Sequence, residues 1–461
     1  MKETKFKQTE FGIIPGDWEE CTLRELIDVL TDFTANGSFE SLAQNVKYLE
    51  KPSYARLIRL TDIRTNFAND GIYVSKESYN FLKKSYLEGG ELLLANVGAY
   101  AGYSFIYPKN LSFRGTLGPN MFLIKFFNQK IDNMFAYYAF SHGIVFNQLV
   151  SKAASSDQPK LNKEDVRTCF VHIPSSLTEQ KNIAQTLSDV DAVISTTEKL
   201  IAKKKNIKQG AMQQLLTGKK RLPGFGTDER TGSRPTDERR KECHSERSTK
   251  REVEESSGYK MTELGMIPSD WEVKTLNELC ECNRSSTLSL PKEFVYVDLE
   301  SVCQGKLLKR QIVKACDAPS RAQRFFEKGD ILYQTVRPYQ KNNLKVDFDA
   351  KNFIASTGYA VLHCKEFLLN SGYLYQYIHT DKFVDMVMDN CSGTSYPAIN
   401  PKTLMTFNII VPSSIVEQTA IAKVLCDMDT EISALETKLA KYRTLKTGMM
   451  QQLLTGKVRL I

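Results

Sequence analysis

Side chains suited to contacting nucleic acid gather in short clusters in each half of this 461-residue chain. Arg and Lys suit guanine edges and phosphates, Gln and Asn suit adenine edges, and Ser and Thr suit phosphates. The candidate DNA-binding residues are Tyr100, Arg114, Gln158, Lys160, Arg321, Arg324, Arg337, Tyr339, Lys341 and Tyr396. Any single one could be a solvated loop residue, and Arg337 could pair with a nearby carboxylate. Because the clusters fall at corresponding places in the two halves, together they favour a DNA-binding face.

Sequence motifs for catalysis are missing. The chain has no G-x-x-x-x-G-K-[ST] phosphate loop, no G-x-G-x-x-G turn after a strand and no aromatic-Pro segment of the kind found in DNA amino-methyltransferases. The chain also lacks an acidic cluster followed by Lys, the pattern that would indicate a two-metal nuclease. The ten Cys form no C-x-x-C pair and the five His are scattered, so we predict no metal site. We expect a chain with no catalytic residues and no cofactor of its own.

The composition is typical of a soluble protein, with 41% apolar and 25% charged residues. A formal net charge of +8 is a weak indication of a polyanionic partner. The chain has no apolar run of about 18 residues that would indicate a membrane span, and its first residues lack the apolar region of a secretory signal. We therefore expect a cytoplasmic protein.

A long capped helix is predicted twice. The segments Ser176–Gly218 and Ser414–Gly456 align without a gap at a shift of 238 residues (414 − 176). Each begins S-x-x-E, the pattern of a capping box in which the Ser hydroxyl and the Glu carboxylate satisfy free N–H groups at a helix start. Each ends in Thr-Gly, and Gly favours the left-handed conformation that stops a helix. At 1.5 Å per residue, each helix would be roughly 60 Å long.

Apolar residues in both helices repeat at alternating steps of four and three, a period of 3.5. This narrow seam is typical of a coiled coil, and we expect the two seams to pack on each other. The alternative, two unrelated amphipathic helices that each lie on their own domain, is disfavoured by the duplicated caps and the matched register. The predicted seam residues are Ile183, Leu187, Val190, Ile194 and Ile201 in the first helix and Ile421, Leu425, Met428, Ile432, Leu435 and Leu439 in the second.

A shorter repeat precedes each globular region. Lys7–Leu26 and Lys260–Leu279 are identical at thirteen of twenty positions, at a shift of 253 (260 − 7), and contain the only two Trp, Trp18 and Trp271. The chain is thus a duplicated set of front motif, globule and long helix. Short apolar stretches bounded by Gly, Pro and Asn, together with a few helical stretches, predict α+β globules.

A change in composition separates the two halves. Pro223–Tyr259 carries 8 Lys/Arg and 9 Asp/Glu in 37 residues with few apolar groups, and such a segment cannot bury enough surface to offset its ordering entropy. The predicted segments are a first globule at 1–173, a long helix at 174–222, a charged linker at 223–259, a second globule at 260–411 and a second long helix at 412–461.

With these repeats the chain resembles the specificity (S) subunit of a type I restriction–modification system. The resemblance covers essentially the whole chain. It is carried by Gly12–Trp18 with Gly265–Trp271, by the Glu-Gln pairs at 179–180 and 417–418, by the QQLLTG segments at 213–218 and 451–456, and by Gly329–Pro338. The long charged linker departs from the pattern, since the family usually has a shorter join.

The resemblance implies a non-catalytic reader of DNA. Each globule would be a target recognition domain, and the two helices would form an antiparallel coiled coil that spaces the domains over a bipartite target. Because the globules have diverged, the two half-sites should differ. The repeated segments would dock two methyltransferase (M) subunits, and two restriction (R) subunits would join for cleavage. S-adenosylmethionine, ATP and Mg are expected in those partner subunits.

The ends of the long helices are the predicted docking sites for the M subunits. They carry polar and small residues that the seam does not explain, namely Gln213, Gln214, Gly210, Gly448, Gln451 and Gln452. A Gly within a helix is about 1 kcal/mol less favourable than Ala, so Gly here indicates close approach by another backbone. A fraying helix end is the simple alternative.

Two other classes of function fit the sequence less well. A coiled-coil scaffold whose globules bind proteins would lack DNA specificity, and measuring sequence-specific DNA binding separates it from a DNA reader. An enzyme that itself modifies or cuts DNA would need the motifs that are missing.

Overall fold

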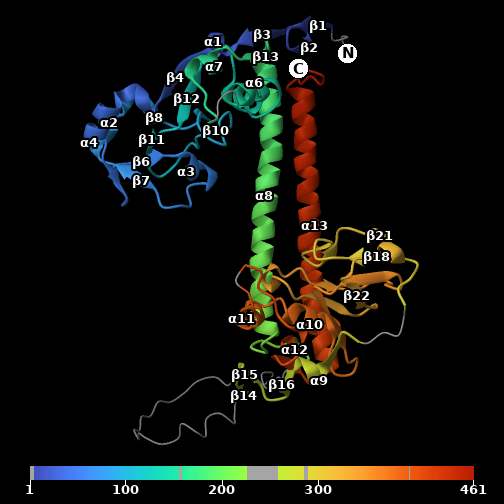
Figure 1. Cartoon of the computed structure of the whole chain (residues 1–461). Helices are drawn as coiled ribbons and strands as arrows, with labels where there is room; N and C mark the ends of the chain where they lie inside the picture. Colours follow the sequence, from blue (N-terminus) through green and yellow to red (C-terminus); the bar gives the residue numbers. More distant parts are fainter. Residues whose placement is uncertain (1–4, 155–157, 226–257, 285–288, 394) are drawn as a thin grey trace, which may run out of the picture. The chain divides into compact units, whose positions relative to one another are not determined.

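The chain forms two compact units in its computed structural model (Figure 1). Unit 1 combines Met1–Glu198 with Thr437–Ile461, and unit 2 is Lys199–Glu436. Most of the predicted charged linker lies outside the residues that the structure describes. The structure describes residues 5–154, 158–225, 258–284, 289–393 and 395–461.

The two long helices, α8 (Leu177–Leu215) and α13 (Ile415–Leu453), have 39 residues each and contribute to both units. The other elements of unit 1 are, in chain order, β1 Phe6–Thr9, β2 Gly12–Pro15, β3 Trp18–Thr22, α1 Leu23–Leu26, β4 Ile27–Asp32, the 3-10 helix η1 Phe33–Asn36, α2 Phe39–Asn45, β5 Tyr48–Leu49, β6 Ala55–Ile58, α3 Leu60–Arg64, β7 Ile72–Val74, α4 Lys76–Phe81, η2 Lys83–Ser85, β8 Tyr86–Leu87, β9 Leu92–Ala95, β10 Ser104–Ile106, β11 Arg114–Leu117, β12 Met121–Phe126, α5 Asn133–Ser141, α6 Gly143–Ala153, α7 Lys163–Arg167 and β13 Phe170–Pro174.

Unit 2 is built from a similar series of short elements. They are β14 Tyr259–Thr262, β15 Gly265–Pro268, β16 Trp271–Thr275, α9 Leu276–Leu279, β17 Cys280–Cys282, β18 Glu293–Val297, β19 Val302–Cys303, β20 Lys306–Leu307, β21 Gln311–Lys314, η3 Ala315–Asp317, β22 Ala322–Phe325, β23 Ile331–Gln334, η4 Pro338–Gln340, β24 Leu344–Lys345, β25 Phe353–Ser356, β26 Tyr359–Cys364, α10 Ser371–Tyr377, α11 Asp381–Asp389, α12 Pro401–Leu404 and β27 Asn408–Pro412.

Two sheets form the body of each unit. In unit 1 their strand orders are β10-β9-β12-β4 and β5-β7-β6-β11-β8, and β6 and β11 are parallel. In unit 2 the orders are β17-β26-β23-β24 and β21-β18-β25-β22, and β18 and β25 are parallel. The central strands β9 and β23 are buried along their whole length, as short continuous apolar runs predict. The shared plan confirms the predicted α+β class and the internal duplication.

The front motif closes each globule. β3 pairs antiparallel with β13, which places Trp18 opposite Pro174, and β16 pairs with β27, which places Trp271 opposite Pro412. Both Trp side chains are fully buried. The chain therefore enters and leaves each globule through one two-stranded sheet.

Within each unit, the segments of α8 and α13 run antiparallel. Their ion pairs show this, because the residue numbers increase along α8 while those of the partners in α13 decrease. The pairs are Asp191–Lys446 and Glu198–Arg443 in unit 1, and Lys204–Glu431 and Lys208–Asp429 in unit 2. Among the seam residues, Ile183, Leu187, Ile201, Ile421, Leu425, Ile432 and Leu439 are buried, and Val190, Ile194, Met428 and Leu435 are partly buried. No helix within the described ranges combines the length and apolarity needed to cross a lipid bilayer.

The start of each long helix packs on a globule as well as on the other helix. Ile183 and Leu187 share one apolar core with Phe135 of the globule and Met450 near the end of α13. Seam residues at the start of α13 lie in the core of unit 2 in the same way. These seam positions therefore pack on side chains of the globule as well as on the other long helix.

The predicted capping box is half formed at the start of α8. The backbone N–H of Glu179 donates to the Ser176 hydroxyl at 3.4 Å. The Glu179 carboxylate, however, accepts hydrogen bonds from Arg459 at 2.5 and 2.7 Å. This carboxylate is buried, so an ion pair is the more favourable use of its charge.

Candidate nucleic-acid interface

In unit 1, two of the predicted clusters meet beyond the end of β9. The backbone N–H of Gly98 donates to the Pro159 carbonyl at 2.8 Å, and an isolated antiparallel bridge joins Lys160 to the same loop. Tyr100 and Lys160 therefore lie on neighbouring loops. Lys160 and Gln158 are exposed, and Tyr100 is half buried.

The same contact recurs in unit 2, beyond the end of β23. The backbone N–H of Arg337 donates to the Pro397 carbonyl at 2.7 Å, which is the counterpart of the Gly98 bond. The Arg337 guanidinium lies 4.3 Å from the centre of the exposed Tyr396 ring, a cation–π contact. No carboxylate pairs with Arg337 within the described residues, so the ion pair considered from sequence is not formed.

Arg337 holds a backbone conformation that residues other than Gly rarely adopt. Its φ is 55°, and its counterpart Gly98 has a φ of 84°. Such strain costs about 1–3 kcal/mol and is found mainly at functional sites. The Nε of Arg337 is also buried, and no described group hydrogen-bonds to it. Both features make Arg337 a candidate for contact with a ligand.

Arg321 lies beside the loop that carries Arg337. Its carbonyl accepts from the backbone N–H of Thr357 at 2.8 Å. The carbonyl of the next residue, Gly358, accepts from Thr335 at 2.9 Å, and Thr335 begins the Arg337 loop. Exposed Arg321 is therefore part of the same candidate surface.

The remaining candidates of unit 2 differ in how available they are. Tyr339 is 49% exposed. Arg324 is partly buried on β22. Lys341 donates to the Asp381 carboxylate at 2.8 Å and to the His379 carbonyl at 2.9 Å, and its hydrogen bond lowers the pKa of Asp381. Lys341 is thus occupied within the protein and would reach DNA only after leaving this ion pair.

Arg114, the last candidate of unit 1, stacks elsewhere. Its guanidinium lies 4.6 Å from the centre of the Tyr54 ring. These residues lie at the start of the parallel strands β11 and β6, so Arg114 is associated with these strands rather than with the loop that carries Tyr100. Ser155–Asp157 and Thr394, which belong to two of the predicted clusters, lie outside the described residues.

Arg64 is not among the residues predicted from sequence. This exposed residue ends α3, and its guanidinium lies 4.1 Å from the centre of the Tyr100 ring. Within the described ranges no carboxylate pairs with it. The arrangement matches that of Arg337 over Tyr396. A lone Arg in a segment without repeat or motif gave no sequence signal for this contact.

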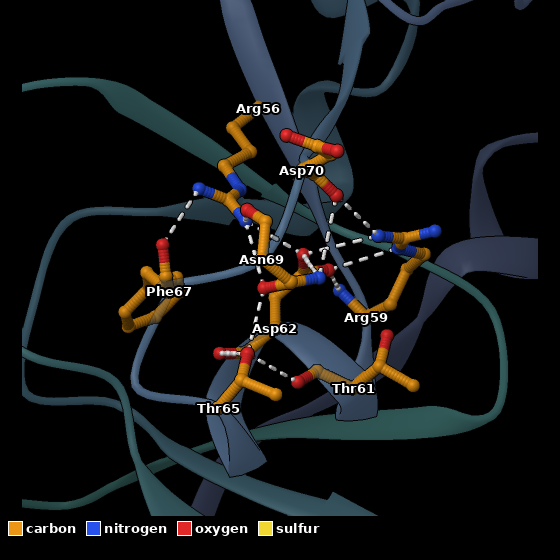
Figure 2. Close-up of polar contacts among 8 residues, drawn as sticks. All are labelled: Arg56, Arg59, Thr61, Asp62, Thr65, Phe67, Asn69 and Asp70. Atoms are coloured by element: carbon orange, nitrogen blue, oxygen red, sulfur yellow. Dashed lines mark hydrogen bonds and ion pairs between the residues drawn. The ribbon is translucent and has the colours of Figure 1, made fainter. Parts of the chain in front are cut away.

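A buried polar cluster holds α3 in place (Figure 2). The carboxylate of fully buried Asp62 accepts from Arg56 at 2.8 Å, from the Arg59 Nε at 2.9 Å and from the Arg59 backbone N–H at 2.8 Å. Asn69 donates to the same carboxylate at 3.0 Å, and its amide oxygen accepts from the Thr65 hydroxyl at 2.7 Å. The cluster ties β6, α3 and the following loop together.

The cluster keeps Asp62 ionised. Burial raises the pKa of the Asp62 carboxyl, but hydrogen bonds from Arg59, Arg56 and Asn69 outweigh burial and lower the pKa to about 2. In this cluster Arg56 and Arg59 balance the charges of Asp62 and Asp70. Because Arg64 adds a further positive charge, the field at this end of α3 favours an anionic ligand.

The predicted M-docking residues lie on a free face of the helix ends. Gly210 and Gly448 are partly exposed, and a Cβ on either would meet no atom within 4 Å. Packing within the described chain therefore gives no reason for Gly at these positions. Nearby Met212 and Met450 are buried in the two cores, so one face of each helix end is packed. The Gln residues, Gln213, Gln214, Gln451 and Gln452, are all exposed.

The residues after the helix ends form an ion cluster with the front motif and with the start of a long helix. In unit 1, Arg459 donates to Asp17 at 2.7 and 2.8 Å in addition to Glu179. The corresponding cluster of unit 2 consists of Arg221, Asp270 and Glu417. The repeated Arg and Glu are therefore accounted for by internal ion pairs.

Packing also explains the repeated Thr-Gly. Gly218 and Gly456 both have a φ of 69°. A Cβ on Gly218 would overlap the ring of Pro268, and a Cβ on Gly456 would overlap the ring of Pro15. Both positions require Gly for its backbone conformation and for space.

Glu327, Asp330 and His363 form a group that could hold a metal ion. The His363 Nδ1 lies 2.7 Å from the Asp330 carboxylate. At the equivalent register position of unit 1, Lys125 donates to Glu88 at 3.0 Å. In unit 1, Lys125 supplies the positive charge beside Glu88. We therefore interpret the contact between His363 and Asp330 in unit 2 as a polar contact within the protein and not as a metal site.

Comparisons with known proteins agree on one family. Residues 15–208 and 268–441 match the type I restriction modification DNA specificity domain. The chain is 22% identical to the type I restriction enzyme MjaVIII specificity subunit of Methanocaldococcus jannaschii, over 99% of this chain and 97% of that protein. It is 25% identical to the type I restriction enzyme HindI specificity subunit of Haemophilus influenzae, over 36% of each.

Solved structures share the fold. The S subunit of a type I restriction-modification system from M. genitalium aligns with a TM-score of 0.55 and 16% identity, over 98% of both chains. A chain from a complex of the type I R-M system aligns with a TM-score of 0.50 and 14% identity, over 96% of this chain and 99% of that chain. At these identities the likeness concerns the fold alone.

Proposed function

Because the chain belongs to the type I restriction modification DNA specificity family, we propose that it reads a bipartite, asymmetric DNA target and positions the enzyme subunits on it. Two M subunits and two R subunits would assemble with the chain. The chain itself would be non-catalytic, and S-adenosylmethionine, ATP and Mg would be bound by those partners. The proposal agrees with a sequence that carries clusters of side chains suited to DNA contact and lacks the motifs of catalysis.

One observation carries the proposal. Both units join the loop after their central strand to a second loop through the same backbone hydrogen bond, from Gly98 to Pro159 and from Arg337 to Pro397. The side chains on these loops differ between the units. A common scaffold with different contact residues is what two unlike half-sites require.

The long helices would set the gap between the half-sites. Each has 39 residues, which corresponds to about 58 Å at 1.5 Å per residue. A helix resists bending over this length far better than a flexible linker would. The proposal therefore expects a target whose two parts are separated by a fixed number of base pairs.

Exchange of one globule tests the half-site assignment. Replacing Ile27–Phe170 by the corresponding globule of a related specificity subunit should change one half-site and leave the other half-site and the gap unchanged. The exchanged segment begins after β3 and ends at Phe170, the first residue of β13, so the rest of the closing sheet is retained. Sequencing the methylated sites in cells that express the system would show the new target.

The matched exchange is Cys280–Asn408 in unit 2, which should change only the other half-site. A change of both half-sites by either exchange would contradict independent reading. Methylation without sequence preference in the unaltered complex would reject the proposed function and favour the protein-binding scaffold.

Substitution of Gly448 tests the docking of M subunits. Gly448→Leu should reduce recovery of M subunits with the chain, because Leu fills a surface that a partner backbone would approach closely. The isolated chain should be as stable as the unaltered chain or slightly more so, since no described atom lies in the way and Gly is about 1 kcal/mol less favourable than Ala in a helix. Co-purification and thermal unfolding would measure the two effects.

A suitable control is Ala440→Leu, at an exposed position on the same helix. It should leave M recovery unchanged. Unchanged recovery with Gly448→Leu would contradict this docking site, and a lower melting temperature of the isolated variant would point to an internal packing role instead.

A further inference from the structure

We propose that each unit reads one guanine with an arginine stacked on a tyrosine: Arg64 on Tyr100 in unit 1, and Arg337 on Tyr396 in unit 2. The inference rests on the proposed function and adds a base identity to it. Each half-site should contain a G·C pair that is recognised by the stacked arginine of its unit.

The two stacks have similar distances from guanidinium to ring but are built from different elements. The guanidinium lies 4.1 Å from the ring centre in unit 1 and 4.3 Å in unit 2. In unit 1 the loop after the central strand supplies Tyr100, and Arg64 comes from α3. In unit 2 the equivalent loop supplies Arg337, and the opposite loop supplies Tyr396. Since the same pair is built from different positions, inheritance of a duplicated residue does not account for it.

Neither guanidinium group, of Arg64 or of Arg337, is engaged in an ion pair with a described carboxylate. Arg56, Arg221 and Arg459, by contrast, are all engaged in ion pairs. The N–H groups of a guanidinium lie in one plane and form a rigid fork. That planar fork matches the O6 and N7 acceptors of guanine in the major groove.

In unit 1 the surroundings hold the stack in place before DNA binds. The Asp62 cluster fixes α3, and the Thr65 hydroxyl donates to the Thr61 carbonyl at 2.9 Å next to Arg64. The Tyr100 ring is supported by an edge contact with Tyr103, with centroids 5.6 Å apart. Side chains that are ordered in advance lose less entropy on binding, which favours affinity and discrimination.

The test uses the full chain assembled with its M subunits, after sequencing of methylated sites has defined the target. Binding is measured at one salt concentration to the target duplex and to a shuffled duplex. Arg64→Lys should weaken target binding about 10- to 100-fold and leave shuffled binding unchanged, because Lys keeps the charge but lacks the fork. Arg337→Lys should act in the same way through the other half-site.

Base substitution identifies the atom that is read. Replacing the guanine of the unit 1 half-site by 7-deazaguanine removes the N7 acceptor, so the unaltered complex should lose about 10-fold in affinity. Arg64→Lys should show no further loss on that duplex. Arg24→Lys is the matched control, since Arg24 is an exposed residue of unit 1 whose partner is Glu164. This variant should bind both duplexes with the affinity of the unaltered complex.

Several results would overturn the inference. Equal weakening on target and shuffled duplexes would make Arg64 a phosphate contact. Unchanged target affinity in Arg64→Lys, or a half-site without a G·C pair, would reject guanine reading while the proposed function stands. If the unaltered complex binds both duplexes equally, the proposed function and the inference both fail.

Discussion

Asp62→Asn is expected to lower the free energy of unfolding of unit 1 by about 3–5 kcal/mol. Removing one partner of a buried ion pair leaves the other charge buried and uncompensated, which is strongly destabilising. Arg56 is only 4% exposed, and its Nε already has no partner among the described groups. Hydrogen exchange followed by mass spectrometry would resolve the loss of protection in unit 1 from unit 2.

The control for this prediction is Asp70→Asn. Asp70 is exposed, and in the cluster it contributes only its backbone carbonyl, to Arg59 and Asn69. Its substitution should change stability by less than about 0.5 kcal/mol. Equal effects of the two substitutions would show that the carboxylate of Asp62 is not what holds the cluster.

The Asp62 carboxylate also predicts that the stability of unit 1 depends on pH. The pKa of Asp62 is lowered from 3.8 to about 2 in the folded chain. Its contribution to stability is therefore fully present above pH 3.8 and is lost as the pH falls toward about 2. The unaltered chain should lose more stability across this interval than Asp62→Asn, and denaturant unfolding at several pH values would measure the difference.

Arg459→Met is expected to destabilise unit 1 by a similar amount, about 3–5 kcal/mol, because it leaves Glu179 buried without its counter-charge. Glu179 is 3% exposed. Its counterpart Glu417 accepts a hydrogen bond from the Trp271 Nε1 at 3.2 Å, whereas the Trp18 Nε1 has no partner among the described groups. Arg459→Met should therefore cost more than Arg221→Met, which can be measured by denaturant unfolding of both variants.

A double variant tests the cause. Arg459→Met with Glu179→Leu removes both charges, and replacement of a buried ion pair by apolar residues is often neutral. The double variant should recover most of the lost stability. As a surface control, Arg443→Met breaks the exposed pair with Glu198 and should cost at most about 1 kcal/mol. No recovery in the double variant would show that packing of Arg459, rather than charge, dominates.

The architecture was readable from sequence where local rules and repeats coincide. Ser176 and Gly218 carry the helix signals, and α8 runs from Leu177 to Leu215 between them. The α+β plan followed from short apolar runs such as Leu92–Ala95. What sequence could not supply was the partner of each buried charge: Glu179 fits a cap in the local sequence, and only the fold brings Arg459 to it.

The candidate interface was readable only in part, for the same reason. Arg337 and Tyr396 belong to clusters that recur in both halves, and the structure places them in contact. Arg64 belongs to no repeat, and its contact with Tyr100 depends on the Asp62 cluster. Arg56, Arg59, Asp62 and Asn69 must meet for that cluster to form, and no spacing rule of a helix or strand predicts such a meeting.

The division of the chain into units has a consequence for its biosynthesis. Unit 2 is continuous in sequence, whereas unit 1 needs residues 437–461 in addition to residues 1–198. A ribosome makes residues 437–461 after every residue of unit 2. Until then Glu179 lacks Arg459, and the core around Ile183 lacks Met450 and Leu453. Unit 1, although it is translated first, is therefore the later of the two to be completed.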